Sequence, residues 1–449
     1  MKKNKKKIKN ISILGTTSDA GKSTLTFIVG RILQDLGYSV VPFKAQNVSN
    51  NAQVASDGSE ISVAQYFQAE VLGVETSYFN NPILLKSGRG STASLIVNGK
   101  AVASKDVLEY YRDLDSLKPA VKLAFEYLDA NYDCVVAEGA GSPVELNLMD
   151  KDLSNIYVAT EFNTKIILVA DIEKGGVFAS IYGVYNLLPK ELRDNVVGVI
   201  VNKFRGDLRL FDKGIEIIEK EFGIAVLGVL PYEALNLGFE DSQSLKNFSQ
   251  DCSESTRKVA VINYPTMSNY NDFEPLLADP NTCVEFVSSN IKLDNFECII
   301  LPGSKLVLED LKWLKRTGLF RQIQKHYDEK QIHIIGICGG YQMMFKQIID
   351  EDGVETDEPT IADGLGFIDD NIIFQKEKIL KRDGYRYQIH NGISKKYPVE
   401  YKSKNIYGTF EHGLFGDDWF EEYKKEKIDT FVELMKSHLD VDRLVKSVS

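Results

Sequence analysis

Long apolar runs and excess positive charge are both absent from this chain of 449 residues, of which 43% are hydrophobic and 26% charged. No apolar run approaches the roughly 20 residues that span a bilayer, so the sequence predicts no membrane-spanning helix. The formal net charge is −11, which argues against general binding to nucleic acid. We therefore expect a globular protein with neither a nucleic-acid nor a membrane partner.

Cysteine is also scarce. The five cysteines are odd in number and form no Cys-x-x-Cys pair, which predicts reduced thiols, no structural metal and a cytoplasmic location. The first residues are rich in lysine, but the next ones already belong to an apolar strand. We therefore expect residues 1–10 to form a solvated basic tail and not a signal peptide.

The most informative segment is residues 11–36, which reads ISILG, TTSDAGKST and LTFIVGRILQDL. An apolar strand leads into a polar turn bounded by Gly15 and Gly21, and the turn leads into an amphipathic helix. Glycines let a backbone approach phosphate oxygens, and the amides of such a turn favour an anion. In this phosphate-binding loop, Lys22 would reach the terminal phosphates and the Ser23 hydroxyl would bind Mg²⁺. The residues assigned to nucleotide binding here are Gly15, Asp19, Gly21, Lys22, Ser23 and Thr24.

A polar segment at residues 44–70 follows the next apolar strand. It contains the turn signal Asp57-Gly58 and leads to a helix expected from Ser62 to Leu72. Its amides and carboxylates, together with Lys44, suit a polar substrate or a metal beside a phosphate site. The alternative is a plain solvated loop.

Apolar runs then alternate with helical segments, which is typical of a parallel sheet covered on both faces. Polar and glycine residues follow the runs, and open parallel sheets bind ligands at the carboxyl ends of their strands. Glu138 stands at the end of one such run and is the best second ligand for Mg²⁺, directly or through water. The alternative role for Glu138 is a helix-capping acid. The apolar runs are residues 132–137, 165–170, 196–201 and 224–230.

The chain turns polar between residues 241 and 257, which predicts a linker between two domains. A fresh alternation of strands and helices begins at residue 258, so the second domain is also expected to be α/β. The predicted division is a first domain at 11–240, a second at 258–418 and a charged helical tail at 419–449.

Cys338 differs from the other cysteines because it lies in the turn GICGGYQ, after an apolar strand and before a helix. Small residues on both sides permit a sharp turn that exposes the side chain at a helix N-terminus, where the thiolate is favoured. A thiolate nucleophile needs a general base and an oxyanion site. His412 is the first candidate for the base and His390 the second. Backbone amides at Gly303 and Gly339 are the candidates for the oxyanion site.

Several of these segments together resemble the cobyric acid synthase family, the glutamine-dependent amidotransferases of cobalamin biosynthesis. The first-half segments are TTSDAGKS, FKAQNVSNN, EGAGSPVELNL and ADIEKGGVFASIYG, and this half is similar to dethiobiotin synthetase. The second-half segments LPGSK, GICGGYQM and GTFEHGLF resemble a class I glutamine amidotransferase domain. The resemblance implies a P-loop parallel-sheet domain followed by a second α/β domain of that class.

The resemblance also implies roles for individual residues. ATP would phosphorylate a substrate carboxylate, with Ser23, Asp57 and Glu138 beside the metal and Asn202 in contact with the base. Cys338 would be the nucleophile and His412 its base. Ordinary enzymes of this class carry a glutamate two residues after the histidine, but Leu414 stands there in this chain. The residue that orients the histidine therefore stays open.

The implied reaction is amidation of four peripheral carboxylates of adenosylcobyrinic acid a,c-diamide, with ammonia released from glutamine at Cys338. An alternative is cobyrinic acid a,c-diamide synthase, which amidates two carboxylates. A different class is a regulatory P-loop ATPase, but these usually carry a second lysine where this chain has Thr17. That class also leaves His412 without a role. The corrinoid and L-glutamine are the expected partners, and the oligomeric state, a homo-oligomer included, stays open.

Overall fold

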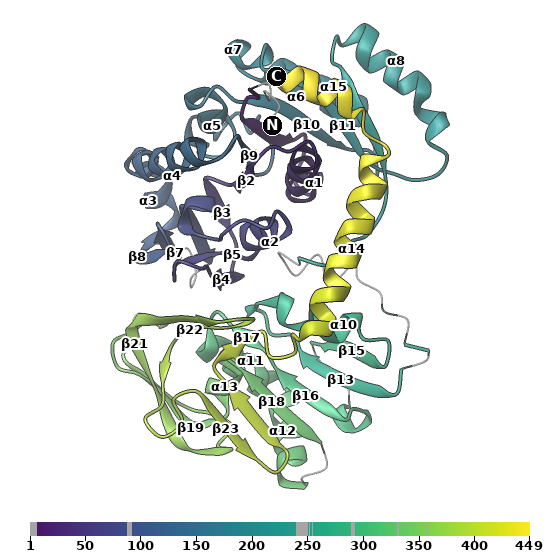
Figure 1. Cartoon of the computed structure of the whole chain (residues 1–449). Helices are drawn as coiled ribbons and strands as arrows, with labels where there is room; N and C mark the ends of the chain where they lie inside the picture. Colours follow the sequence, from purple (N-terminus) through teal and green to yellow (C-terminus); the bar gives the residue numbers. More distant parts are fainter. Residues whose placement is uncertain are drawn as a thin grey trace.

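The computed structural model describes residues 7–87, 92–238, 250, 252–253, 255–288, 292–329, 332–356 and 358–449. Two α/β domains lie one above the other, and a long C-terminal helix runs between them (Figure 1). Among the helices of the described residues, none has the length and apolarity needed to cross a bilayer.

The first domain is built on a parallel sheet with the strand order β12-β11-β10-β1-β9-β2. β1 and β9 are buried at every position, as expected for a sheet covered on both faces. The predicted parallel sheet is thus confirmed, with the four later apolar runs forming β9 to β12. The strands are β1 (Ile11–Gly15), β2 (Val40–Phe43), β9 (Cys134–Glu138), β10 (Lys165–Asp171), β11 (Val196–Phe204) and β12 (Val226–Pro231).

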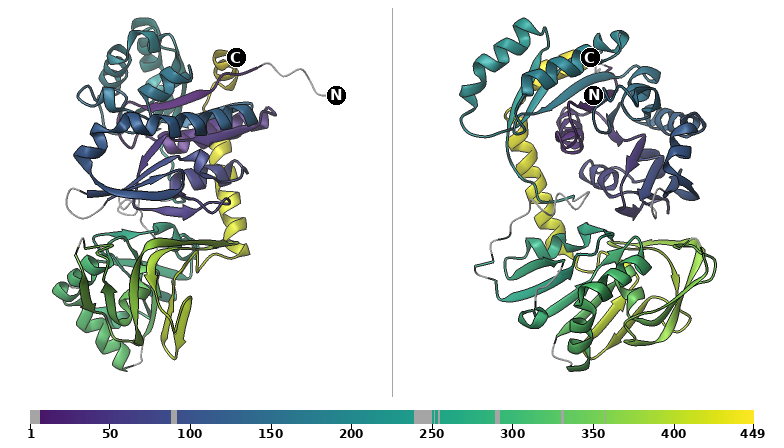
Figure 2. Two further views of the ribbon diagram at one scale, coloured as in Figure 1. Left: turned by 90° about the vertical axis from the view of Figure 1, so that its left-hand side faces the viewer. Right: turned by 180° about the vertical axis from the view of Figure 1, so that it is seen from behind.

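Helices cover both faces of this sheet (Figure 2). α1 (Lys22–Asp35) buries Leu25, Ile28, Ile32 and their neighbours against it, which follows from the 3.6-residue spacing of these side chains. The other helices of the domain are α2 (Val63–Val71), α3 (Val107–Arg112), α4 (Lys118–Asn131), α5 (Ile156–Glu161), α6 (Val177–Leu187), α7 (Lys190–Arg193) and α8 (Asp212–Glu221).

The polar segment at residues 44–70 is not a solvated loop. Lys44 and Asn47 are only 5% and 4% exposed. The segment forms three short strands, β3, β4 and β5, followed by α2. β3 belongs to a small sheet of order β3-β6-β7-β8, and β4 and β5 pair with each other as a hairpin. These strands are β3 (Gln46–Val48), β4 (Ala52–Val54), β5 (Glu60–Ser62), β6 (Ile83–Ser87), β7 (Thr92–Val97) and β8 (Lys100–Asp106).

The second domain has a sheet of order β15-β13-β16-β18-β24-β23, parallel except for β23 at one edge. A second sheet, β20-β19-β21-β22-β25, lies beside it. The strands are β13 (Arg257–Ile262), β14 (Met267–Ser268), β15 (Thr282–Val287), β16 (Cys298–Leu301), β17 (Gly303–Ser304), β18 (His333–Ile337), β19 (Phe345–Asp350), β20 (Thr360–Asp363), β21 (Ile368–Asp383), β22 (Arg386–Ile393), β23 (Glu400–Ser403), β24 (Ile406–Thr409) and β25 (Glu411–His412). The helices are α10 (Glu274–Ala278), α11 (Val307–Thr317), α12 (Leu319–Glu329) and α13 (Gly339–Met343).

The chain ends with two helices, α14 (Asp418–Lys436) and α15 (Val441–Val448), that return from the second domain to the first (Figure 1). Phe431, Val432 and Met435 of α14 are buried in the same apolar cluster as α1. The backbone N–H of Asp440 donates to Leu227 O at 2.8 Å, which ties the segment between the helices to β12. The predicted helical tail is therefore an integral part of the first domain's core.

The N-terminal prediction does not hold from Ile8 onward. Ile8 is 3% exposed, and the N–H of Lys9 donates to the carbonyl of Val448 at 2.8 Å. Residues 1–6 lie outside the described residues, as do residues 241–249, 251 and 254 of the predicted linker.

The prediction of reduced thiols was wrong for one pair of cysteines. Cys252 and Cys283 form a disulfide, 31 residues apart in sequence. Cys134, Cys298 and Cys338 are free. The pairing joins the end of the polar stretch to β15, a long-range contact that cysteine count and spacing do not reveal.

Candidate active site

The phosphate-loop segment connects the end of β1 to the start of α1. Gly21 adopts φ 100°, and a Cβ at this position would lie 2.2 Å from Asn202 Nδ2, so only glycine fits. The Lys22 ammonium donates to the carbonyls of Gly141 at 2.9 Å and Thr17 at 3.3 Å. Lys22 thus lies over its own loop, where the terminal phosphates of a nucleotide would offer it stronger partners.

The other residues expected at the nucleotide lie at the same edge of the sheet. Asn202, near the end of β11, donates from Nδ2 to Ala20 O at 2.9 Å, so the structure brings this residue to the loop. Asp19 lies in the loop with φ 57°, and its carbonyl accepts from Lys203 Nζ at 2.6 Å. Thr24 lies in the first turn of α1.

Glu138 is the last residue of β9 and is 1% exposed. Its Oε1 accepts hydrogen bonds from Ser23 Oγ and Lys44 Nζ, both at 2.8 Å. Its Oε2 accepts from Gln68 Nε2 at 2.6 Å and from Gln65 Nε2 at 3.3 Å. The carboxylate predicted to bind the metal therefore lies against the phosphate-loop serine and accepts hydrogen bonds on both of its oxygens.

Burial alone would raise the pKa of Glu138, but Lys44 and the hydrogen bonds from Gln68 and Ser23 outweigh burial and lower it. The carboxylate therefore stays ionised at neutral pH. A buried anion beside a serine hydroxyl is a donor set of hard oxygens, which suits Mg²⁺ that also takes water and phosphate oxygens. Gln65 and Gln68 are contacts that the sequence analysis did not assign.

Asp57 is separate from this network. It lies exposed in the turn between β4 and β5, where Oδ1 accepts from the Ser59 N–H at 2.9 Å and Oδ2 from the Tyr78 N–H at 3.2 Å. Within the described residues, neither Ser23 nor Glu138 contacts Asp57 by a hydrogen bond. These contacts are typical of an aspartate that stabilises a turn through backbone N–H groups.

Cys338 stands between β18 and α13 with φ 50° and ψ −104°. Positive φ is rare for a residue with a Cβ and marks a strained turn. Gly340 permits this turn, since a Cβ there would lie 1.9 Å from Leu301 O. The thiol donates to the carbonyl of Ile389 at 3.4 Å, so the sulfur faces the start of the second sheet.

His412 contacts a carboxylate that the sequence analysis did not identify. His412 Nδ1 lies 2.6 Å from Asp272 Oδ2, and Asp272 Oδ1 accepts from the Gly413 N–H at 2.8 Å. The Tyr387 ring stacks on the imidazole with centroids 5.0 Å apart, and the Tyr387 hydroxyl accepts from Asn269 Nδ2 at 2.8 Å. Asp272 thus orients the imidazole ring. It takes the place of the glutamate that ordinary enzymes of this class carry two residues after the histidine, where this chain has Leu414.

The electrostatics favour a charged imidazole. Burial alone would lower the pKa of His412, but Asp272 and Cys338 outweigh it and raise the pKa to about 10. An imidazolium beside a cysteine stabilises the thiolate form of that cysteine. His412 is therefore a protonated imidazole beside Cys338, with the buried Asp272 carboxylate behind it.

His390 has a different environment. Its Nδ1 lies 2.7 Å from Gly392 O, and its ring stacks on Phe410 at 3.9 Å. Burial lowers its pKa to about 4, so the ring is neutral at pH 7. The geometry thus separates the two candidate histidines, because His390 has no carboxylate partner among the described residues.

The two glycines predicted at the oxyanion site lie on adjacent elements, Gly303 on β17 and Gly339 at the start of α13. A Cβ at Gly339 would lie 2.6 Å from Ser304 N, and a Cβ at Gly303 would lie 3.1 Å from His412 Cε1. The Gly340 N–H donates to Pro302 O at 2.9 Å, which joins the two segments directly. The backbone segments of Gly303 and Gly339 thus lie side by side next to Cys338.

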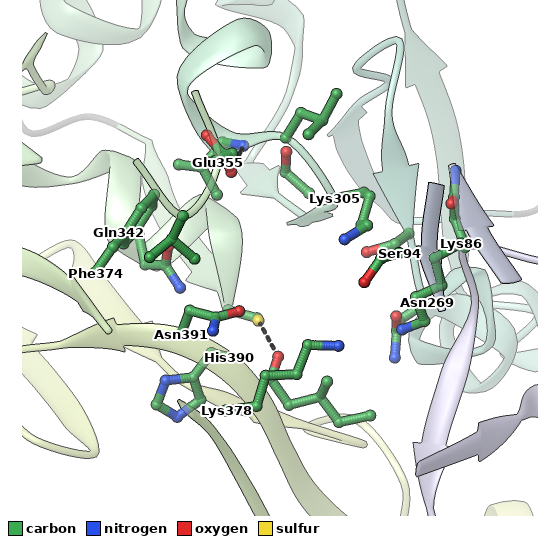
Figure 3. Close-up of a pocket in the computed structure, with 18 of the residues that line it drawn as sticks. Lys86, Ser94, Asn269, Lys305, Gln342, Glu355, Phe374, Lys378, His390 and Asn391 are labelled. Atoms are coloured by element: carbon green, nitrogen blue, oxygen red, sulfur yellow. Dashed lines mark hydrogen bonds between the residues drawn. The ribbon is translucent and has the colours of Figure 1, made fainter. Parts of the chain in front are cut away.

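A cavity of about 230 Å³ contains Cys338 and His412 and is lined by residues of both domains. Lys86 and Ser94 come from the first domain, whereas Lys378 and His390 come from the second (Figure 3). The glutaminase candidates therefore open onto the boundary between the domains and not onto the outer surface of the second domain.

A buried carboxylate joins the two domains at this cavity. Glu60, on β5, is 0% exposed and pairs with Lys86 at 2.6 Å and with Lys378 at 2.8 Å. Burial alone would raise the pKa of Glu60, but the two lysines outweigh it and lower the pKa. Nearby, the Asn269 N–H donates to Asn51 Oδ1 at 2.6 Å across the same boundary.

Comparison with known families matches both halves of the chain. Residues 11–244 match the model described as CobQ/CobB/MinD/ParA nucleotide binding domain, so the first half is a nucleotide-binding domain. Residues 258–397 match the model described as CobB/CobQ-like glutamine amidotransferase domain. The α/β architecture of both halves agrees with these matches.

Curated relatives cover nearly the whole chain. A cobyric acid synthase of Acinetobacter baylyi is 56% identical over 98% of this chain and 99% of its own length. A probable cobyric acid synthase of Picrophilus torridus is 42% identical over 98% of this chain and 95% of its own. A cobyric acid synthase of Listeria monocytogenes is 36% identical over 98% of this chain and 96% of its own.

Proposed function

Since this chain belongs to the cobyric acid synthase family, glutamine-dependent amidotransferases of cobalamin biosynthesis, we propose that it amidates four peripheral carboxylates of adenosylcobyrinic acid a,c-diamide. ATP and L-glutamine are the proposed co-substrates, and Mg²⁺ is the proposed metal. The observation that carries the proposal is the buried contact of His412 with Asp272 beside Cys338, in a chain that also carries the phosphate-loop site.

Glutamine hydrolysis is proposed for the second domain. The Cys338 thiolate attacks the side-chain amide carbon of glutamine, and the amides of Gly303 and Gly339 stabilise the oxyanion. The His412 imidazolium gives its proton to the departing nitrogen, so the C–N bond breaks and ammonia leaves as the thioester forms. Neutral His412 then takes a proton from water, which hydrolyses the thioester to glutamate and restores the thiolate. Asp272 holds the ring in position throughout.

Carboxylate activation is proposed for the first domain. Lys22 stabilises negative charge on the transferring phosphoryl group, which ATP supplies. Ser23 and Glu138 would hold Mg²⁺ through their oxygen atoms, and Lys44 keeps the Glu138 carboxylate ionised. Asn202 is the proposed contact to the base. Asp57 is the weakest of the proposed metal neighbours, because its carboxylate is engaged in a turn.

The product formed by the purified protein tests this proposal. Incubation with ATP, Mg²⁺, glutamine and the diamide should give four successive mass decreases, each corresponding to exchange of OH for NH₂. A product that stops after two amidations, starting from cobyrinic acid, would favour the a,c-diamide synthase instead. ATP hydrolysis without any amidated product would favour the regulatory ATPase.

A further inference from the structure

Three lysines line the cavity that contains Cys338, namely Lys86, Lys305 and Lys378. Two of them are neutralised by the same buried carboxylate, because Glu60 pairs with Lys86 at 2.6 Å and with Lys378 at 2.8 Å. The third, Lys305, forms neither an ion pair nor a side-chain hydrogen bond with any residue in the described part of the chain. Among the described residues, Lys305 is thus a cavity lysine that no carboxylate contacts directly, although the charges of Glu60 and Glu355 lie near enough to act on it.

The backbone of Lys305 is held in place. Its N–H donates to Thr266 O at 2.9 Å, and the preceding Ser304 donates from its hydroxyl to Asp310 Oδ2 at 2.6 Å. Asp310 also accepts from the Thr266 hydroxyl at 2.7 Å, which closes a small network below the loop. Figure 3 shows the Lys305 side chain extending from this loop into the cavity. The backbone from which the Lys305 side chain extends is therefore held in place next to Gly303.

Glu355, an acid that lines the cavity, already has partners. Its Oε1 and Oε2 accept from the N–H groups of Val307 and Leu308, at 2.6 and 2.7 Å, at the start of α11. Burial, with the like charges of Lys378 and Lys86, lowers the pKa of Lys305 to about 8. Lys305 is half-buried, so its ammonium is only partly hydrated, and an anionic group that enters the cavity is stabilised beside it.

We propose that Lys305 binds the α-carboxylate of glutamine and thereby selects glutamine among primary amides. The inference rests on the proposed glutaminase function of Cys338. Glutamine carries its carboxylate at the opposite end from the amide that the thiolate attacks, and both Lys305 and Cys338 line the one cavity. The lysine is a specificity residue and does not take part in bond breaking. A carboxylate of the corrinoid is the competing ligand, and the test below separates the two.

The test compares three amide substrates in wild type and in Lys305→Met. Glutaramate keeps the carboxylate of glutamine but lacks its amine, whereas γ-aminobutyramide keeps the amine but lacks the carboxylate. Loss of one buried charged contact should raise KM for glutamine and for glutaramate about 30- to 100-fold, with kcat changed less than about threefold. Hydrolysis of γ-aminobutyramide should be the same in both proteins. Lys305→Arg should restore most of the affinity for glutamine.

The matched control is Lys312→Met, which removes an exposed lysine of α11 outside the cavity and should leave all three KM values unchanged. Amidation driven by ammonium salt should also be unchanged in Lys305→Met. If that activity falls instead, the lysine binds the corrinoid and the inference is wrong. Equal loss of activity toward glutamine and γ-aminobutyramide would likewise overturn it.

Calorimetry separates this inference from the proposed function. Glutamine should bind to Cys338→Ala and bind far more weakly to Cys338→Ala with Lys305→Met. If wild type does not hydrolyse glutamine but this difference in binding is observed, the glutaminase assignment fails and the Lys305 assignment stands. If the two variants bind glutamine equally, the Lys305 assignment fails whatever the wild type does.

Discussion

Replacement of Asp272 by asparagine tests the carboxylate found behind His412. Asparagine is close in shape and keeps a hydrogen bond to the ring, but it removes the negative charge 2.6 Å from Nδ1. The pKa of His412, raised from 6.5 to about 10, corresponds to a preference for the protonated ring of roughly 5 kcal/mol. Breaking a buried charge pair costs about 3–5 kcal/mol, so kcat/KM for glutamine should fall about 10²- to 10⁴-fold.

The pH dependence of kcat/KM shows in which direction loss of the Asp272 charge shifts the pKa of His412. In wild type the ring stays protonated up to a pH of about 10, because its pKa is raised. Without the Asp272 charge the proton is lost at lower pH, so the alkaline limb of kcat/KM should move toward neutrality. Glutamate release measures the glutaminase, and amidation with ammonium salt in the same preparation measures the first domain.

Two results would refute the assigned role of Asp272. One is a variant with normal glutaminase activity and an unchanged alkaline limb, since the charge would then have no effect on the ring. The other is an equal loss of glutamine-dependent and ammonia-dependent synthesis, which would indicate general destabilisation. Asp272→Glu, which keeps the charge, should retain more activity than the asparagine variant.

Five further variants separate the two sites. Lys22→Ala should abolish amidation from both glutamine and ammonia, because both routes need the activated carboxylate; near-normal synthesis would exclude the loop from the reaction. Glu138→Gln should weaken the Mg²⁺ response and, by leaving the buried Lys44 without its anion, lower the free energy of unfolding by about 1–3 kcal/mol; an unchanged Mg²⁺ titration would contradict the ligand role. Cys338→Ala should lose glutamine hydrolysis but keep ammonia-dependent amidation, while His390→Asn should be milder than His412→Asn; persistent hydrolysis by Cys338→Ala would remove the nucleophile.

Residues whose environment is set by their near neighbours in sequence could be predicted. Lys22 and Cys338 each lie in a turn between a strand and a helix, and the small residues that such a turn requires are adjacent in the chain. Their placement follows from local sterics and from the helix N-terminus that comes next. The two domain folds could be predicted for the same reason, because alternating strands and helices form parallel sheets.

Residues whose role depends on distant contacts could not be predicted. Asp272 is 140 residues from His412 in sequence, and nothing in its local spacing distinguishes it from other acids. The family resemblance implied a place beside the metal for Asp57, yet the β4 and β5 hairpin holds this residue in an exposed turn. Glu60, three residues later, was not singled out, although it is the acid that joins the domains.

The return of α14 and α15 to the first domain has a consequence for the order of folding during synthesis. The apolar cluster around α1 and the parallel sheet includes Phe431, Met435 and Leu444, which follow the whole second domain in the sequence. Domains usually fold as they emerge, N-terminal first. Here the N-terminal domain has to wait with an open apolar surface until the second domain has been made, and only then does its core close.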